Sequence, residues 1–253
     1  MIILAREDQG LNTFRGVSAM SSFDLDLRPV VDLDADTRGD FVVRVYQHLL
    51  GAIAAFAGIE ALLLNTGFAE AMYNWISGGT WLLILGLFIV GQWIVANAAA
   101  DLLNPQKQYA ALFGSAALYA VLFAPLLHYF FRVADDGATS VAAAGLITAL
   151  AFAGLTVVGF VTRKDLSFIR PIIMYGCVAA AVLIVGAILF GFSLGIWFSV
   201  AMIALSGAAI LYQTQTIIRK YPQQAHVAAA LGLFSSVMTM FWYVLRLVGQ
   251  LRR

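Results

Sequence analysis

The sequence contains seven apolar stretches of about 20 residues each, which alternate with short polar breaks from Phe41 onward. An α-helix rises about 1.5 Å per residue, so about 20 residues cross the roughly 30 Å hydrocarbon core of a bilayer. The pattern therefore predicts an all-α integral membrane protein with seven transmembrane helices, near residues 43–64, 80–101, 108–130, 140–162, 168–191, 196–218 and 226–248. A six-helix arrangement with a re-entrant last segment is the alternative.

The composition agrees with a chain whose solvent is largely lipid. Hydrophobic residues make up 62% of the sequence and charged residues only 11%, whereas a soluble domain has about 25% charged residues. A chain with so few charged residues does not have enough polar groups to form a surface that faces water. We therefore expect the lipid bilayer to be the main environment of the chain.

Several classes of function are disfavoured by residue counts. The single cysteine, Cys177, excludes a disulfide framework, and the three histidines are too far apart for a sequence-local metal motif. A net charge of +1 gives no indication of a basic surface that would bind nucleic acid. The sequence also lacks a phosphate loop and a nucleophile–base–acid set. We expect neither an enzyme nor a bound cofactor.

The charged residues divide the chain into two parts. Residues 1–40 hold 12 of the 29 charged residues, four arginines against eight acids. This segment lacks sustained apolar periodicity, which predicts an acidic, mostly disordered extramembrane tail. Residues 41–253 form the predicted seven-helix transmembrane domain.

Lysine and arginine near the helix ends predict the orientation, because they are enriched on the cytoplasmic side of membrane proteins. If the N-terminus is cytoplasmic, the loops on that side hold most basic residues: Arg38, Arg44, Lys107, Arg163, Lys164, Arg219 and Lys220. The loops on the opposite side hold Arg132, although the C-terminus adds Arg252 and Arg253. We expect a multi-pass integral membrane protein with a cytoplasmic N-terminus.

Polar side chains form a stripe on each of the last two predicted helices. Positions seven apart in the sixth stretch share one helix face and hold Ser199, Ser206 and Gln213. Steps of three and four in the seventh stretch place on one face Ser236, Thr239, Tyr243 and Arg246. These stripes are expected to face each other or a shared cavity. Alternatively, these side chains only hold the helices together, and each interhelical hydrogen bond stabilises the bundle by about 0.6 kcal/mol.

Two ionisable residues stand out because a charge inside a membrane is costly and marks a functional site by default. Arg246 lies about two turns from the end of its helix, where it either reaches the interface or closes a polar pathway. Glu60 lies about one turn from the interface. The alternative for Glu60 is that it only marks the end of its helix. The candidate polar path or helix–helix latch consists of Gln213, Ser236, Arg246, Ser206, Thr239 and Glu60.

Small residues recur every four positions on the fourth predicted helix. Gly145, Ala149 and Ala153 repeat the small-xxx-small pattern that allows helices to approach closely in membranes. We therefore expect this face to pack against a neighbouring helix.

Three segments of the second half resemble the Bax inhibitor family, the seven-helix proteins also called TMBIM or, in bacteria, YccA-like. The segments are RKDLSFIRPIIMYG (163–176), AAILYQTQTII (208–218) and ALGLFSSVMTMFWYVLRLVG (230–249). The resemblance implies a Bax-inhibitor-like bundle, a role in stress regulation and, through its YccA-like members, a location in a bacterial inner membrane. It also implies a cation path in which two buried aspartates on the last two helices share a proton as a pH-sensitive latch.

The sequence departs from the family pattern at the latch itself. The two aspartate positions match Gln213 and Ser236, and the neighbouring arginine of the family matches Arg246. Neither an amide nor a hydroxyl ionises near neutral pH. Two functions are therefore expected. The first is a leak channel for cations, specifically calcium, without the di-aspartate latch. The second is a non-conducting regulator of a membrane partner such as a protease.

Overall fold

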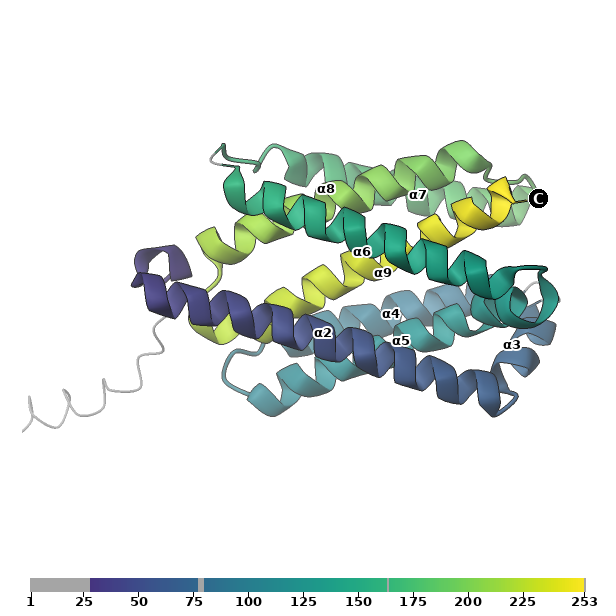
Figure 1. The fold of residues 1–253 in the computed structure, drawn as a ribbon, viewed down its shortest axis with the longest axis horizontal. Coiled ribbons are helices and arrows are strands. Elements are labelled where there is room, and N and C mark those ends of the chain that lie inside the picture. The colour runs from purple at the N-terminus through teal and green to yellow at the C-terminus, as the bar shows by residue number, and fades with distance from the viewer. Residues whose placement is uncertain (1–27, 77–79, 163, 253) are drawn as a thin grey trace, which may run out of the picture.

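The structure, a computed structural model, describes residues 28–76, 80–162 and 164–252 of the chain. The described residues form an elongated bundle of helices that run side by side (Figure 1). The long helices are α2 (Ala35–Asn65), α4 (Trp81–Ala99), α5 (Pro105–His128), α6 (Gly137–Val161), α7 (Ile169–Phe190), α8 (Ile196–Lys220) and α9 (His226–Leu251). Shorter helical segments are η2 (Val30–Asp32), α3 (Phe68–Ile76), η3 (Tyr129–Val133) and η4 (Gln223–Ala225).

The prediction of seven transmembrane helices is confirmed. Within the described residues, seven helical segments are long and apolar enough to cross a bilayer, and each coincides with one predicted stretch. The last helix, α9, is continuous over 26 residues, about 39 Å at the rise of an α-helix. It has the length of a full span, so a re-entrant last segment is not needed.

The first helix begins earlier than expected. It was predicted near residue 43, but α2 starts at Ala35, because the Asp34 side chain caps it by accepting a hydrogen bond from the Thr37 N–H at 2.9 Å. Just before it, Val30 is fully buried and its N–H donates to the Tyr221 carbonyl at 2.9 Å. Residues 28–40 are thus attached to the bundle, whereas the rest of the predicted tail lies outside the described residues.

Two helices form the centre of the bundle. The helix α9 contacts α2, α4, α5, α6 and α8, and half of its residues are buried, as are half of those of α5. Figure 1 shows α9 running obliquely through the middle of the bundle. The helix α7 packs mainly on α8 and has the smallest buried share of the seven spans. The polar stripe of α9 therefore lies among several helices, and α7 leaves most of its surface to the surrounding lipid.

The small-residue face predicted on the fourth span does not form the helix contact. A Cβ added at Gly145 would meet nothing within 4 Å, and Ala149 and Ala153 are exposed. The close approach lies in the last turn of α6, where a Cβ on Gly159 would come within 2.9 Å of the Thr214 side chain on α8. The expectation for Gly145, Ala149 and Ala153 was wrong, because the buried face of α6 is set by Ala144, Thr148 and Gly159.

The connections place the ends of the helices as the polar breaks predicted. Gly191 takes a left-handed conformation with φ of 73° and ends α7, so α8 starts only five residues later at Ile196. The longer break between the first two spans contains the short helix α3, which packs on α5. The connections that follow α4, α6 and α8 lie at the end of the bundle where α2 begins.

Candidate functional site

The two polar stripes meet at one hydrogen bond. On α8, Gln213 accepts through its Oε1 atom a hydrogen bond from the Ser236 hydroxyl of α9, with 3.1 Å between the two oxygens. Ser236 is 8% exposed, so this contact lies inside the bundle. The structure thus joins the two residues that occupy the latch positions of the family resemblance. Their contact is neutral, because neither side chain ionises near neutral pH.

Two other hydroxyl groups of the stripes bond within their own helices, whereas the buried Ser199 hydroxyl has no hydrogen-bond partner within the described residues. The Ser206 hydroxyl donates to the Met202 carbonyl at 2.9 Å, and the Thr239 hydroxyl donates to the Ser235 carbonyl at 2.8 Å. Such bonds to the preceding turn satisfy a polar side chain without a partner helix. Ser206 and Thr239 therefore belong to the predicted face without bridging α8 and α9.

Arg246 lies at the far end of the stripe. Its Nη2 atom donates to the Leu194 carbonyl at 2.8 Å, in the connection between α7 and α8. Ten residues of helix separate Arg246 from Ser236, about 15 Å along the axis. The structure therefore does not bring Arg246 to the Gln213–Ser236 contact. It uses the guanidinium to tie the end of α9 to the α7–α8 connection.

Glu60 lies on a different helix and near the opposite end of the bundle from Gln213. It is 4% exposed, and within the described residues neither carboxylate oxygen has a hydrogen-bond partner. It stands five residues before the end of α2, whereas Gln213 stands seven residues before the end of α8 at the other end of the bundle. Glu60 is therefore a separate buried polar group and not part of the α8–α9 contact.

A buried amide that the sequence reasoning missed is Gln215. Its Oε1 atom accepts from the Leu166 N–H at 2.9 Å, and its Nε2 atom donates to the carbonyls of Lys164 at 2.6 Å and Thr162 at 3.2 Å. One side chain on α8 thus fixes the connection between α6 and α7. The cost of an amide in an apolar helix was the available signal, but its backbone partners lie about 50 positions earlier in the chain.

Three cavities follow α9 along its length. A cavity of about 360 Å³ lies near the α7–α8 connection and is lined from α4, α5, α7, α8 and α9. Toward the other end, a cavity of about 510 Å³ lies between α4 and α9, and one of about 530 Å³ lies between α7, α8 and α9. Tyr221 and Gly232 line both of the latter cavities. The polar stripe of α9 is thus bordered by hollows toward both ends of the bundle.

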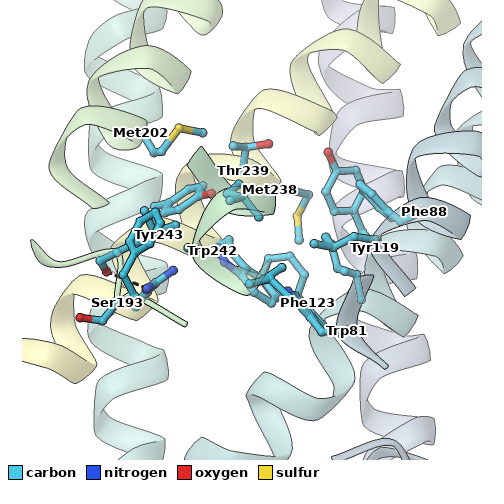
Figure 2. Close-up of a pocket in the computed structure, with 18 residues that line it drawn as sticks. Trp81, Phe88, Tyr119, Phe123, Ser193, Met202, Met238, Thr239, Trp242 and Tyr243 are labelled. Atoms are coloured by element: carbon cyan, nitrogen blue, oxygen red, sulfur yellow. Dashed lines mark hydrogen bonds between the residues drawn. The ribbon is translucent and has the colours of Figure 1, made fainter. Parts of the chain in front are cut away.

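Aromatic side chains form much of the wall of the 360 Å³ cavity. Figure 2 shows Tyr243 and Ser193 on one side and Tyr119 with Phe88 on the other, with Thr239 and Met238 between them. Phe123 stacks on Trp242 edge to face, with ring centroids 4.9 Å apart. The cavity therefore has a largely aromatic wall, whose polar groups include the Ser193, Thr239, Tyr119 and Tyr243 hydroxyls and the Arg246 guanidinium.

One backbone carbonyl separates this cavity from its neighbour toward the other end. The Ser235 carbonyl accepts hydrogen bonds from both the Tyr119 hydroxyl, at 3.2 Å, and the Thr239 hydroxyl, at 2.8 Å. Tyr119 and Thr239 line the 360 Å³ cavity, and Ser235 lines the 510 Å³ cavity. Together with the Gln213–Ser236 contact, this group closes the polar stripe between the two ends of α9.

The charged side chains that line the three cavities are cationic. They are Arg246 in the first, Lys220 in the second and Arg170 in the third. Within the described residues there is no group of three or more His, Cys, Asp or Glu side chains that could hold a metal ion. The arrangement can bind neutral or anionic polar groups more readily than a bare divalent cation, which prefers several oxygen ligands.

Comparisons with known proteins agree with this arrangement of helices. The family described as "Inhibitor of apoptosis-promoting Bax1" matches residues 38–253 of the chain. An uncharacterised protein of Neisseria meningitidis serogroup A is 30% identical over 129 residues, which are 51% of this chain and 56% of that protein. An uncharacterised protein of Pseudomonas aeruginosa is 29% identical over 126 residues, which are 49% of this chain and 56% of that protein. The chain thus spans about half the length of these relatives.

The family match begins within α2, continues through all seven long helices and includes the Gln213–Ser236 contact. It covers well over half of the sequence. The chain belongs to the Bax inhibitor family.

Proposed function

We propose that this protein is a non-conducting membrane regulator, which acts on a membrane protein partner such as a protease. The Gln213–Ser236 hydrogen bond carries the proposal. In the family resemblance these positions hold a pair of aspartates, whose coupled ionisation would push two helices apart. A neutral amide–hydroxyl pair has no such charge to gain. The contact between α8 and α9 therefore stays closed at every pH at which the protein works.

The charges along α9 support the same function. A calcium ion requires several hard oxygen ligands with negative charge. Arg246, Lys220 and Arg170 border the three cavities instead, and their positive charges repel a cation entering from either end. The same positive charges favour contact with anionic groups on lipids or on a partner.

The orientation we propose is N-terminus inside, in a bacterial inner membrane. The connections after α4, α6 and α8 lie at the end of the bundle where α2 begins, and the Val30–Tyr221 hydrogen bond joins the segment before α2 to the connection after α8. Basic residues gather at this end, among them Arg38, Arg44, Lys107, Lys164 and Lys220. The excess of lysine and arginine supports a cytoplasmic location for it, and the relatives of known source are bacterial proteins.

A cation leak is the second candidate, and Glu60 is the observation that favours it. A buried carboxylate without a hydrogen-bond partner among the described residues is costly. Such a group is a candidate for proton or cation binding. The hollows toward both ends of α9 supply part of a route. This function requires the closure at Ser235 and Gln213 to open.

Ion flux through the purified protein in liposomes separates the two functions. We expect calcium and potassium release from loaded proteoliposomes to equal that from protein-free liposomes, with an ionophore added last to show that the ions were retained. Flux above that of protein-free liposomes that disappears in a Glu60→Gln variant would overturn the regulatory function and assign the leak to Glu60.

A further inference from the structure

The cavity between α7, α8 and α9 has the shape of a binding site that opens beside the cytoplasmic ends of these helices. Its volume is about 530 Å³, within the range of about 300–1,000 Å³ usual for sites that hold small molecules. The inner wall consists of small residues, Ala209 on α8 with Ala229 and Gly232 on α9. Because these side chains are short, the helices leave a hollow instead of a filled contact.

The lining changes from polar to apolar along the helices. Arg170, in the first turn of α7, and Tyr221, which follows α8, lie at the cytoplasmic end. Two turns further along α7, the lining consists of Cys177 and Val178. Seven residues separate Arg170 from Cys177, about 10 Å along the helix. The cavity therefore has a cationic mouth at the depth of lipid headgroups and, at the depth of acyl chains, a mainly apolar interior that also holds Gln213.

The α6–α7 connection, which leads into Arg170, is held in place by α8. Gln215 binds the backbone of Lys164 and Leu166, which fixes this connection over the end of α8. The Lys220 Nζ atom lies 3.5 Å from the Ser167 hydroxyl. Asp165, in the same connection, accepts hydrogen bonds from the Ser167 hydroxyl and N–H, which lower the pKa of its carboxyl group.

We propose that this cavity binds one anionic glycerophospholipid of the cytoplasmic leaflet. The phosphate binds the Arg170 guanidinium at the mouth, and one acyl chain occupies the hollow beside Ala229 and Gly232. Positive charge selects an anionic headgroup, and the apolar interior selects a lipid over a free phosphate ion. Because Gln213 also lines the cavity, the bound acyl chain contacts one partner of the α8–α9 hydrogen bond. The proposal is independent of whether the protein conducts ions.

Native mass spectrometry of the full chain in detergent tests the proposal. The protein is mixed with equal amounts of phosphatidylglycerol and phosphatidylcholine that carry the same acyl chains. We expect preferential retention of phosphatidylglycerol, and about a fivefold loss of that preference in Arg170→Gln, the effect of one basic residue on anionic lipid. Arg170→Lys should retain the preference. Arg132→Gln, which removes an exposed arginine at the other end of the bundle, is the matched control and should resemble the wild type.

The single cysteine gives a second measurement, which uses the wild-type protein. Cys177 is exposed and lines the cavity, so its alkylation by N-ethylmaleimide should slow severalfold when phosphatidylglycerol is added. Excess inorganic phosphate should neither protect Cys177 nor displace the lipid.

Several results would overturn the site. These are equal retention of the two lipids, equal loss in Arg170→Gln and Arg132→Gln, displacement by inorganic phosphate, and a bound polypeptide that excludes the lipid.

Discussion

Gln213 and Gln215 show how the same residue type serves two tasks on one helix. Gln213 was predicted because its spacing of seven from Ser206 places it on a stripe, and a stripe is a local pattern. Gln215 was missed because its partners, near Thr162 and Leu166, are brought to it only by the packing of α6 against α8. Residue identity and spacing therefore predicted the faces of the helices. They could not predict which backbone groups a buried amide satisfies.

Removing the Gln215 amide should destabilise the protein more than removing the Gln213 amide. In Gln215→Ala the Leu166 N–H and two carbonyls lose their partner, and leaving buried polar groups unpaired costs about 1–3 kcal/mol. In Gln213→Ala one neutral hydrogen bond to Ser236 is lost, about 0.6 kcal/mol. Unfolding in mixed micelles of dodecyl maltoside and dodecyl sulfate measures both. Equal losses of stability would show that Gln215 does not fix the connection.

At the scale of helices, apolar length predicted all seven spans but misplaced the start of the first. The residues before Phe41 are rich in charge, so they were assigned to the tail. In the structure Asp34 caps α2 and Val30 packs against the bundle. A cap needs only one carboxylate, and a segment of three residues is too short to carry a periodic signal. The boundary of a helix depends on such single contacts. A pattern read over many residues does not detect them.

The cap at Asp34 should give the start of α2 a pH-dependent stability. Hydrogen bonds from the Thr37 N–H and hydroxyl lower the pKa of the Asp34 carboxyl group. The stabilisation is therefore fully present above the pKa of an unfolded aspartate, about 3.9, and is lost as the pH falls through the lower value in the folded protein. Amide exchange of residues 35–38 should accelerate across this range, beyond its intrinsic pH dependence. Asp34→Asn, which still caps but does not ionise, should remove the extra acceleration; an unchanged profile would contradict the cap.

Two glycines on α6 form a matched pair for the contact between α6 and α8. Gly145→Ala should raise stability by about 0.5–1 kcal/mol, because the site is open and alanine favours the helix. Gly159→Ala should lower stability by about 1–3 kcal/mol, because the new Cβ would lie 2.9 Å from the Thr214 Cβ atom. Thermal unfolding in detergent gives both values. A gain of stability at Gly159 would mean that the two helices are not closely packed there.

At the scale of the whole molecule, the sequence predicted the arrangement of helices better than it predicted the cavities between them. The bundle, its seven spans and the ends at which connections lie followed from apolar length and helix order. The cavities along α9 did not, because they arise where small residues from α8 and α9 meet beside α4 and α7. Such hollows depend on packing between distant segments. They appear only when the helices are assembled.

Single-cysteine labelling tests the orientation of the assembled bundle. On a Cys177→Ser background, cysteines at Arg38, Asp165 and Lys220 should react with a membrane-impermeant reagent from the cytoplasmic face. A cysteine at Asp136, in the connection between α5 and α6, should react from the opposite face. The basic residues that gather at the first end are the reason for this expectation. Labelling of Arg38 and Lys220 from opposite faces would contradict the bundle.

The pH dependence of ion flux in liposomes tests the central claim, that a neutral contact keeps α8 and α9 closed. Calcium flux is measured between about pH 6 and 8 for the wild type, Gln213→Asp, Ser236→Asp and the double variant. The wild type should show no flux at any pH. The double variant should gain a pH-dependent flux, because two carboxylates at hydrogen-bond distance share a proton and separate when both ionise; each single variant should change much less. A steep pH-dependent flux in the wild type, or a double variant that matches it at every pH, would contradict the account.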